Sequence, residues 1–301
     1  MASRTAGEVS KRVPLLELRG VSKRFGAVQA LTDVRFDVFP GEVVALVGDN
    51  GAGKSTLIKV ISGIYSSDEG KTLWEGREVT IHSPNDSKAL GIATVYQDLA
   101  LCDNLDVVAN LFLGREDAGP RALGPLGVIN ELTMEARAVE VLRRLSVKIP
   151  SVRIPIASLS GGQRQSVAVA RSVLWANKVV LLDEPTAALG VAQTREVLDL
   201  VKRLRDEGGH GVVIISHNLA DVFEVADRIT VLRLGRYVGT YEAGKVGREQ
   251  LVGLMTGAVP GLAEHEDPTA SAVAATTTES LPPAVPPGAS GPPSAPGGGA
   301  S

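Results

Sequence analysis

The chain has 301 residues, and 44% of them are hydrophobic, which is enough for a sizeable buried core and excludes a wholly disordered protein. Its 31 basic and 34 acidic residues leave a formal net charge of −3. This balance provides no overall positive field for the phosphates of a nucleic acid, so no nucleic acid is predicted as a partner.

The N-terminal segment and the single cysteine bear on location. Residues 1–13 are predicted to be an N-terminal extension, and they contain no apolar run of the kind found in secretory signals. Apolar runs further along are much shorter than the ~18 residues that a membrane-spanning helix needs. Cys102 has no cysteine to pair with in the chain, which fits a reducing compartment, with no selection on redox state as the alternative. We therefore expect a chain that does not cross a membrane by itself.

Short apolar runs alternate with amphipathic stretches along the chain. The apolar runs are predicted to be strands buried on both faces, and the amphipathic stretches have apolar residues at helical spacing. In chain order we predict a strand within Gly41–Gly48, helices at Ser55–Ile64, Thr133–Leu145 and Gln165–Trp175, a strand within Lys178–Glu184, a helix at Gln193–Arg205 and a strand within Gly211–Ser216. This order favours an α/β fold with a mostly parallel sheet.

The C-terminal segment has a different composition. From Pro268 to Ser301 it consists mainly of Pro, Ala, Gly, Ser and Thr, with Glu279 as its only charged residue. Such a segment has too little large apolar surface to offset the entropy of ordering, so residues 261–301 are predicted to be a disordered tail. A passive tail is the simpler interpretation, and a tether or a docking peptide is the alternative.

A phosphate-binding loop is predicted directly after the first of these strands and directly before the first helix. Backbone N–H groups of its glycines would converge on phosphate oxygens, Lys54 would reach the β- and γ-phosphates, and the Ser55 hydroxyl would bind Mg²⁺. A glycine turn that only caps the helix is the alternative. The loop consists of Gly48, Asp49, Asn50, Gly51, Ala52, Gly53, Lys54 and Ser55, with Thr56 next to it.

Two acidic residues end the strand within Lys178–Glu184. A carboxylate at this place, Asp183, can hold Mg²⁺ through water, and its neighbour Glu184 can polarise the attacking water in phosphoryl transfer. A solvated strand end is the alternative, and a phosphate loop in the same chain makes this alternative less favoured.

The pentapeptide Leu159 to Gln163, LSGGQ, is followed by RQSVAVARSV and resembles the signature motif of ATP-binding-cassette (ABC) ATPases. A loop in which Ser160 caps the following helix is a simpler interpretation that is compatible with this one. The resemblance covers about Leu15 to Thr256. It implies a P-loop NTPase fold with an antiparallel β subdomain and a helical subdomain, in an ATPase domain at 14–260 whose helical subdomain spans about 85–160.

The resemblance also implies roles for three further residues. Phe25 is similar to the aromatic residue that stacks on adenine, with a core phenylalanine as the alternative. Gln97 is similar to the glutamine that senses Mg²⁺ and the γ-phosphate beside the membrane-subunit contact, and a surface glutamine is the alternative. His217 is similar to the histidine that contacts the γ-phosphate, and a structural histidine is the alternative.

In the family that the chain resembles, two cassettes enclose ATP and Mg²⁺ between them. Ser160, Gly161, Gly162 and Gln163 of one copy would close over the nucleotide held by the phosphate loop of the other. The resemblance implies a homodimer, with a heterodimer left open, bound to integral membrane permease subunits on the cytoplasmic side of the cell membrane. A solute-binding protein would be an indirect partner.

Residues Ser83 to Glu116 resemble the corresponding segment of ATPases that serve ribose, xylose and fructose importers. This favours the ATP-hydrolysing subunit of a monosaccharide importer. The alternatives are a soluble cassette ATPase of translation, DNA repair or chromosome maintenance, an exporter cassette, and a regulatory ATP-binding protein. One position departs from the family: Gly190 stands where an aspartate is usual after the Mg²⁺ motif.

Overall fold

The computed structural model describes residues 13–117, 129–175, 178–206 and 209–261. The predicted N-terminal extension and tail lie almost entirely outside these ranges. The strands are β1 (Leu16–Phe25), β2 (Val28–Val38), β3 (Val43–Val47), β4 (Glu69–Trp74), β5 (Arg77–Val79), β6 (Ile92–Val95), β7 (Val179–Asp183), β8 (Gly211–Ile215), β9 (Arg228–Arg233) and β10 (Arg236–Glu242). The helices are α1 (Lys54–Ile61), α2 (Pro84–Ala89), α3 (Val107–Phe112), α4 (Glu131–Arg144), the short 3₁₀ turn η2 (Ile156–Ser158), α5 (Gly161–Trp175), α6 (Val191–Asp206), α7 (Leu219–Val225) and α8 (Arg248–Thr256).

The strands follow the order β5-β4-β1-β2-β10-β9-β3-β8-β7-β6. Strands β9, β3, β8, β7 and β6 pair in parallel, and β10 pairs antiparallel with β9. Strands β1, β2, β4 and β5 form an antiparallel part that adjoins the core through β2 and β10. The predicted α/β class, with a mostly parallel core and an antiparallel β part, is confirmed.

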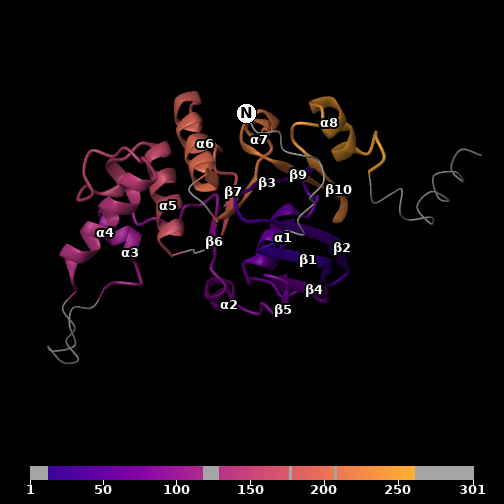
Figure 1. Cartoon of the computed structure of the whole chain (residues 1–301), viewed down its shortest axis with the longest axis horizontal. Coiled ribbons are helices and arrows are strands. Elements are labelled where there is room, and N and C mark those ends of the chain that lie inside the picture. The colour runs from indigo at the N-terminus through magenta and orange to yellow at the C-terminus, as the bar shows by residue number, and fades with distance from the viewer. Residues whose placement is uncertain (1–12, 118–128, 176–177, 207–208, 262–301) are drawn as a thin grey trace, which may run out of the picture.

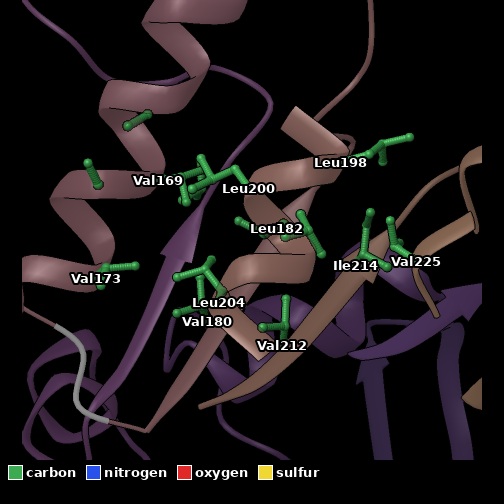
Figure 2. Packing of buried hydrophobic residues seen from close by; sticks show 14 of the residues in the cluster. Val169, Val173, Val180, Leu182, Leu198, Leu200, Leu204, Val212, Ile214 and Val225 are labelled. Carbon is green, nitrogen blue, oxygen red and sulfur yellow. The ribbon is translucent and has the colours of Figure 1, made fainter. Parts of the chain in front are cut away.

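The parallel strands are buried on both faces because they lie between two hydrophobic clusters. In β3, Val43, Ala45 and Val47 belong to one cluster, while Val44 and Leu46 belong to the other. The first cluster includes residues of α5 and α6, and Figure 2 shows Val180 and Leu182 of β7 packed against these helices. This two-sided burial explains why the strands are continuous apolar runs rather than alternating ones.

The register of three neighbouring strands positions the site. Leu46 of β3 pairs with Ile215 of β8, which in turn pairs with Asp183 of β7. The three strands therefore end at the same level of the sheet. Chain segments that follow them, although far apart in the sequence, emerge side by side at this edge.

Each of the four predicted helices is present, with ends that differ by a few residues. The first ends at Ile61 rather than Ile64, because Gly63 adopts a left-handed φ of 75° and the N–H groups of Ile64 and Tyr65 both turn back to the Lys59 carbonyl. The other three begin earlier than predicted, at Glu131, Gly161 and Val191, because polar or glycine residues precede each start.

Helices α3, α4 and α5 form a group beside the core sheet, to the left in Figure 1, and this is the helical part that the fold class predicts. The helical subdomain is predicted at about 85–160. The range 85–160 includes β6, whose residues pair with β7 in the core sheet. We therefore propose that the helical subdomain begins after β6. Within the described ranges, no helix is long and apolar enough to cross a membrane.

Candidate functional site

A cavity of about 620 Å³ lies at the edge of the sheet where β3, β7 and β8 end. The predicted phosphate loop forms one wall, through residues 50–56, and Gln97, Asp183 and Glu184 face it. Sequence segments that are more than 100 residues apart thus meet in one cavity. Ser55, which is exposed, and the half-buried Thr56 begin α1 next to Lys54.

Glycine is required in the loop by the close approach of its backbone to neighbouring strands. Gly53 has a φ of 99°, and a Cβ on it would lie 2.8 Å from Leu31 Cδ2 and 3.0 Å from the Ala30 carbonyl oxygen. Gly51 also has a positive φ, of 79°, but a Cβ there would meet no atom within 4 Å. The backbone conformation and the contact with β2 therefore require glycine at position 53, while position 51 requires it through its conformation alone.

The ammonium group of Lys54 lies over the loop. It donates hydrogen bonds to the carbonyl oxygens of Gly48, at 2.7 Å, and Asp49, at 3.0 Å. Burial lowers the pKa of Lys54, whereas the carboxylates of Glu184, Asp49 and Asp183 act in the opposite direction. A partly buried cation at the mouth of a glycine loop is suited to phosphate oxygens.

Glu184 and His217 form a hydrogen-bonded pair, with 2.7 Å between Glu184 Oε2 and His217 Nδ1. The Glu184 side chain is 17% exposed, while that of His217 is 73% exposed. Glu184 has a φ of 50°, and its N–H donates to the Ile215 carbonyl across β7 and β8. The carboxylate is therefore held by a strained turn and by a neighbouring strand end, as is common at functional sites. His217 is not part of the cavity wall.

Asp183 supplies a second carboxylate to the cavity. Burial raises its pKa above the ordinary value, and the neighbouring Glu184 raises it further, while Lys59 and Lys54 oppose these effects. Ser55, Gln97 and Asp183, the three predicted Mg²⁺ ligands, all line the cavity and all offer oxygen atoms, which Mg²⁺ prefers. Over the described ranges no cluster of three His, Cys, Asp or Glu side chains could hold a metal alone. The residues fit an ion that takes its remaining ligands from phosphates and water.

Phe25 is at the end of β1 and does not line the cavity, but residues 28–30 at the start of β2 do. The Phe25 ring is 40% exposed and packs edge-to-face on Tyr65, with 4.9 Å between ring centroids. The Lys23 ammonium lies 5.5 Å from the Phe25 centroid. A ring that is 40% exposed is not a core phenylalanine, and its stacking on adenine stays a prediction.

The signature loop lies apart from this cavity. Figure 1 shows α5, which begins at Gly161, among the helices to the left, while α1 lies to the right with β1 and β2. The Ser160 N–H donates to Gln163 Oε1 at 3.0 Å, and the Gln163 N–H donates to Ser160 Oγ at 3.2 Å. The predicted helix cap by Ser160 is therefore present. Gly162 is buried, and a Cβ on it would lie 2.9 Å from Gln193 Cβ.

Sequence reasoning missed two walls of the cavity. One consists of Val28, Gln29 and Ala30 in β2, and the other of Leu234 and Gly235 in the turn between β9 and β10. The Gly235 N–H donates to the Ala52 carbonyl at 3.1 Å, so this turn supports the phosphate loop. The only local signal is the glycine between two short strands, which indicates a turn but not what the turn contacts.

Comparison with known proteins identifies close relatives. The chain is 47% identical to the xylose/arabinose import ATP-binding protein of Sulfolobus acidocaldarius over 80% of its own length and 94% of that protein's. It is 45% identical to the fructose import ATP-binding protein of Rhizobium meliloti, over 81% and 95% of the respective lengths.

Solved structures agree with this comparison. A nucleotide-free ATP-binding cassette from an ABC transporter matches with a TM-score of 0.68 and 25% identity, over 87% of this chain and 98% of that chain. A dimeric cassette in a post-hydrolysis state, bound to ADP and Pi, matches with a TM-score of 0.62 and 26% identity, over 76% and 98%. The family model for ABC transporters matches residues 31–187, which include the phosphate loop, Gln97, the signature loop and Glu184. Together with the cavity, these matches show that the chain belongs to the ABC transporter family and is one of its ATP-binding cassettes.

Proposed function

We propose that this chain hydrolyses ATP to energise the import of a monosaccharide. The observation that carries the proposal is the convergence of Lys54, Asp183 and Glu184 at one cavity, with His217 bonded to Glu184. The relatives that the chain spans almost completely are both sugar import ATP-binding proteins. A soluble cassette ATPase of translation, DNA repair or chromosome maintenance is not favoured by any contact in the structure.

In this proposal the phosphate loop and Lys54 hold the phosphates of ATP, and Phe25 stacks on the adenine ring. Ser55, Gln97 and Asp183 would hold Mg²⁺, which supplies charge neutralisation for the phosphoryl group when it is bound. The oxygen atoms of the cavity wall support the binding of Mg²⁺, and the position of the Lys54 ammonium over the loop supports the binding of phosphates.

Glu184 would accept a proton from, or polarise, the water that attacks the γ-phosphate. With Glu184 ionised, His217 Nδ1–H donates to its carboxylate and so restricts the orientation of that group. Its exposed imidazole leaves the second ring nitrogen free to contact a phosphate oxygen. Lys54 would counter the charge on the transferring group.

A second copy of the chain would complete the site. Ser160 is exposed, its loop lies away from the chain's own phosphate loop, and a solved relative is a dimer bound to ADP and Pi. We propose a homodimer in which Ser160, Gly161 and Gly162 of one copy, with Gln163 as their support, cover the nucleotide of the other. A heterodimer with another cassette is the alternative.

A groove of about 400 Å³ between the core and the helical subdomain is suited to a membrane permease subunit. It is lined by Tyr96, next to Gln97, and by the partly exposed apolar residues Ile64 and Leu113. Its charged lining residues, in the described part of the chain, are Lys88, Arg115 and Arg171, so an acidic, amphipathic helix would fit. Docking there would hold the chain at the cytoplasmic side of the membrane.

The Glu184→Gln variant tests the proposed chemistry. It should retain ATP binding but lose kcat by about 10²- to 10⁴-fold, because the glutamine amide cannot act as a base. It should also accumulate as an ATP-bound dimer, measured by light scattering after size-exclusion chromatography. Full activity of this variant, or monomers at saturating ATP and Mg²⁺ when no partner cassette is missing, would contradict the proposal.

The transported solute requires a separate experiment. The chain should co-purify in mild detergent with a membrane subunit, and in liposomes that complex with its solute-binding protein should show ATPase stimulation by one of xylose, arabinose, ribose or fructose. Stimulation by none of these sugars, but by another class of solute, would contradict the monosaccharide assignment while leaving the ATPase assignment intact.

A further inference from the structure

Arg171 connects the helix of the signature loop to the segment that carries Gln97. It lies in α5, which begins at Gly161. Its guanidinium donates two hydrogen bonds, from Nη1 to the Ala100 carbonyl and from Nη2 to the Leu99 carbonyl, each at 2.9 Å. These carbonyls belong to the second and third residues after Gln97. The function proposed above places Arg171 in the lining of the groove for a membrane subunit, but it gives this arginine no part in hydrolysis.

The segment that Arg171 holds is partly exposed and contains a strained residue. Gln97 and Ala100 are exposed, and Ala100 adopts a left-handed φ of 49°, which costs an alanine about 1 kcal/mol. Such a turn persists only where its surroundings impose it. The guanidinium fork imposes it, because it binds the carbonyls of two consecutive residues at once.

A second buried side chain fixes the next part of the segment. Asn110 of α3 is fully buried, accepts a hydrogen bond from the Cys102 N–H at 2.7 Å and donates to the Cys102 carbonyl at 3.0 Å. The amide also donates to the carbonyls of Leu105 and Asp106. Residues 99–102 are therefore held by α5 on one side and by α3 on the other, and Gln97 lies two residues before this anchored stretch.

We propose that Arg171 is a positioning residue that ties Gln97 to the signature helix, so that the placement of Gln97 in the cavity depends on the position of α5. The role in hydrolysis rests on the proposed function, while the tie itself does not. A planar fork with two parallel donors matches two adjacent carbonyls, and a lysine ammonium would not reproduce this geometry.

The test compares Arg171→Met and Arg171→Lys with the matched control Arg205→Met. Arg205 lies on α6, is 29% exposed and forms ion pairs with Asp206 and Asp227, far from Gln97 in the sequence. Hydrogen exchange of the full-length protein should show at least tenfold faster exchange of the amides of residues 98–102 in Arg171→Met, and parental exchange there in the control.

Kinetics provide the second measurement. For Arg171→Met we expect kcat to fall about tenfold, a loss of ~1.4 kcal/mol in transition-state stabilisation, while KM for ATP changes less than threefold, because the phosphate loop is untouched. Arg171→Lys should fall between this variant and the parent. In a Gln97→Ala background, Arg171→Met should cause no further loss of kcat, because Arg171 acts through Gln97.

Several results would overturn the proposal. Additive losses in the double variant would mean that Arg171 acts independently of Gln97. Parental exchange at residues 98–102 in both Arg171 variants would mean that there is no tie, and equal effects of Arg205→Met would mean general destabilisation. If Arg171→Met does not fold, Arg171→Lys decides through the same exchange measurement. Absence of ATP hydrolysis in the parent would refute the proposed function, while the exchange data would still decide the tie.

Discussion

Replacing Asp183 with Asn should stabilise the nucleotide-free protein and weaken its response to Mg²⁺. Asp183 is a half-buried carboxylate beside Glu184, and both burial and Glu184 raise its pKa, so its charge is unfavourable in the folded state. The amide keeps the shape of the side chain but removes the charge. Stabilising changes at functional positions are commonly worth about 1 kcal/mol, which is about 3 °C in Tm for a domain of this size.

Differential scanning calorimetry at pH 8 provides the assay, with ATP added in EDTA or in Mg²⁺. For the parent at 100 times Kd, ligand binding adds about 2.7 kcal/mol, and Mg²⁺ should increase this. For Asp183→Asn, the shift in Tm between the thermograms with and without Mg²⁺ should be smaller than in the parent. Asp199→Asn, at a carboxylate that is 50% exposed, is the control and should change neither Tm nor the response. A lower Tm for Asp183→Asn without nucleotide, or an undiminished Mg²⁺ response, would refute this reasoning.

Three further predictions use other features of the fold. Gly53→Ala should lower the free energy of unfolding of the nucleotide-free protein by about 2–3 kcal/mol in urea titrations, and Gly51→Ala should lower it by about 1 kcal/mol. Both positions have a left-handed φ, but only a Cβ at position 53 also clashes with atoms of β2. Equal losses in the two variants would contradict the clash. Gly190→Asp should raise the free energy of unfolding by a few tenths of a kcal/mol, because Gly190 caps the start of α6 and a Cβ there meets nothing within 4 Å. If the cooperativity of ATP hydrolysis is unchanged in this variant, the missing aspartate is neutral. Glu42→Gln should become more stable relative to the parent as pH rises from about 5 to 8. Burial raises the pKa of Glu42, so the folded parent loses stability as that carboxyl ionises. A difference in the free energy of unfolding that stays constant with pH would refute the raised pKa.

The contiguous motifs could be predicted because their physics is local. A phosphate loop needs glycines, a lysine and a hydroxyl in one short segment between a strand and a helix, so it can be identified without any tertiary contact. The two-sided burial of β3, β7 and β8 follows from their continuous apolar runs. Helix ends were less predictable, because α1 is terminated by Gly63 and its neighbours through backbone bonds that no apolar pattern encodes.

The remaining parts of the site depend on which strands are neighbours. Ala30 and Gly235 reach the phosphate loop because β10 lies beside β2 and β9 beside β3. The hydrogen bond from Arg171 to Leu99 spans 72 residues. Its acceptor is a backbone carbonyl, a group that every residue type has, so no sequence pattern marks it. The placement of β6 within the predicted helical range is a similar case, since a four-residue strand leaves only a weak pattern.

The alignment of Leu46, Ile215 and Asp183 across three strands constrains the chemistry more than any single motif. Glu184 and His217 meet because each follows its strand at the same level, and the Glu184 N–H bonds the Ile215 carbonyl. A one-residue slip of β8 would turn its side chains to the opposite faces and carry His217 about 3.3 Å along the strand, out of reach of Glu184. The pairing of Glu184 with His217 therefore depends on the apolar residues that fix this register, although among the apolar residues of β3, β7 and β8 only Ile215 lines the cavity.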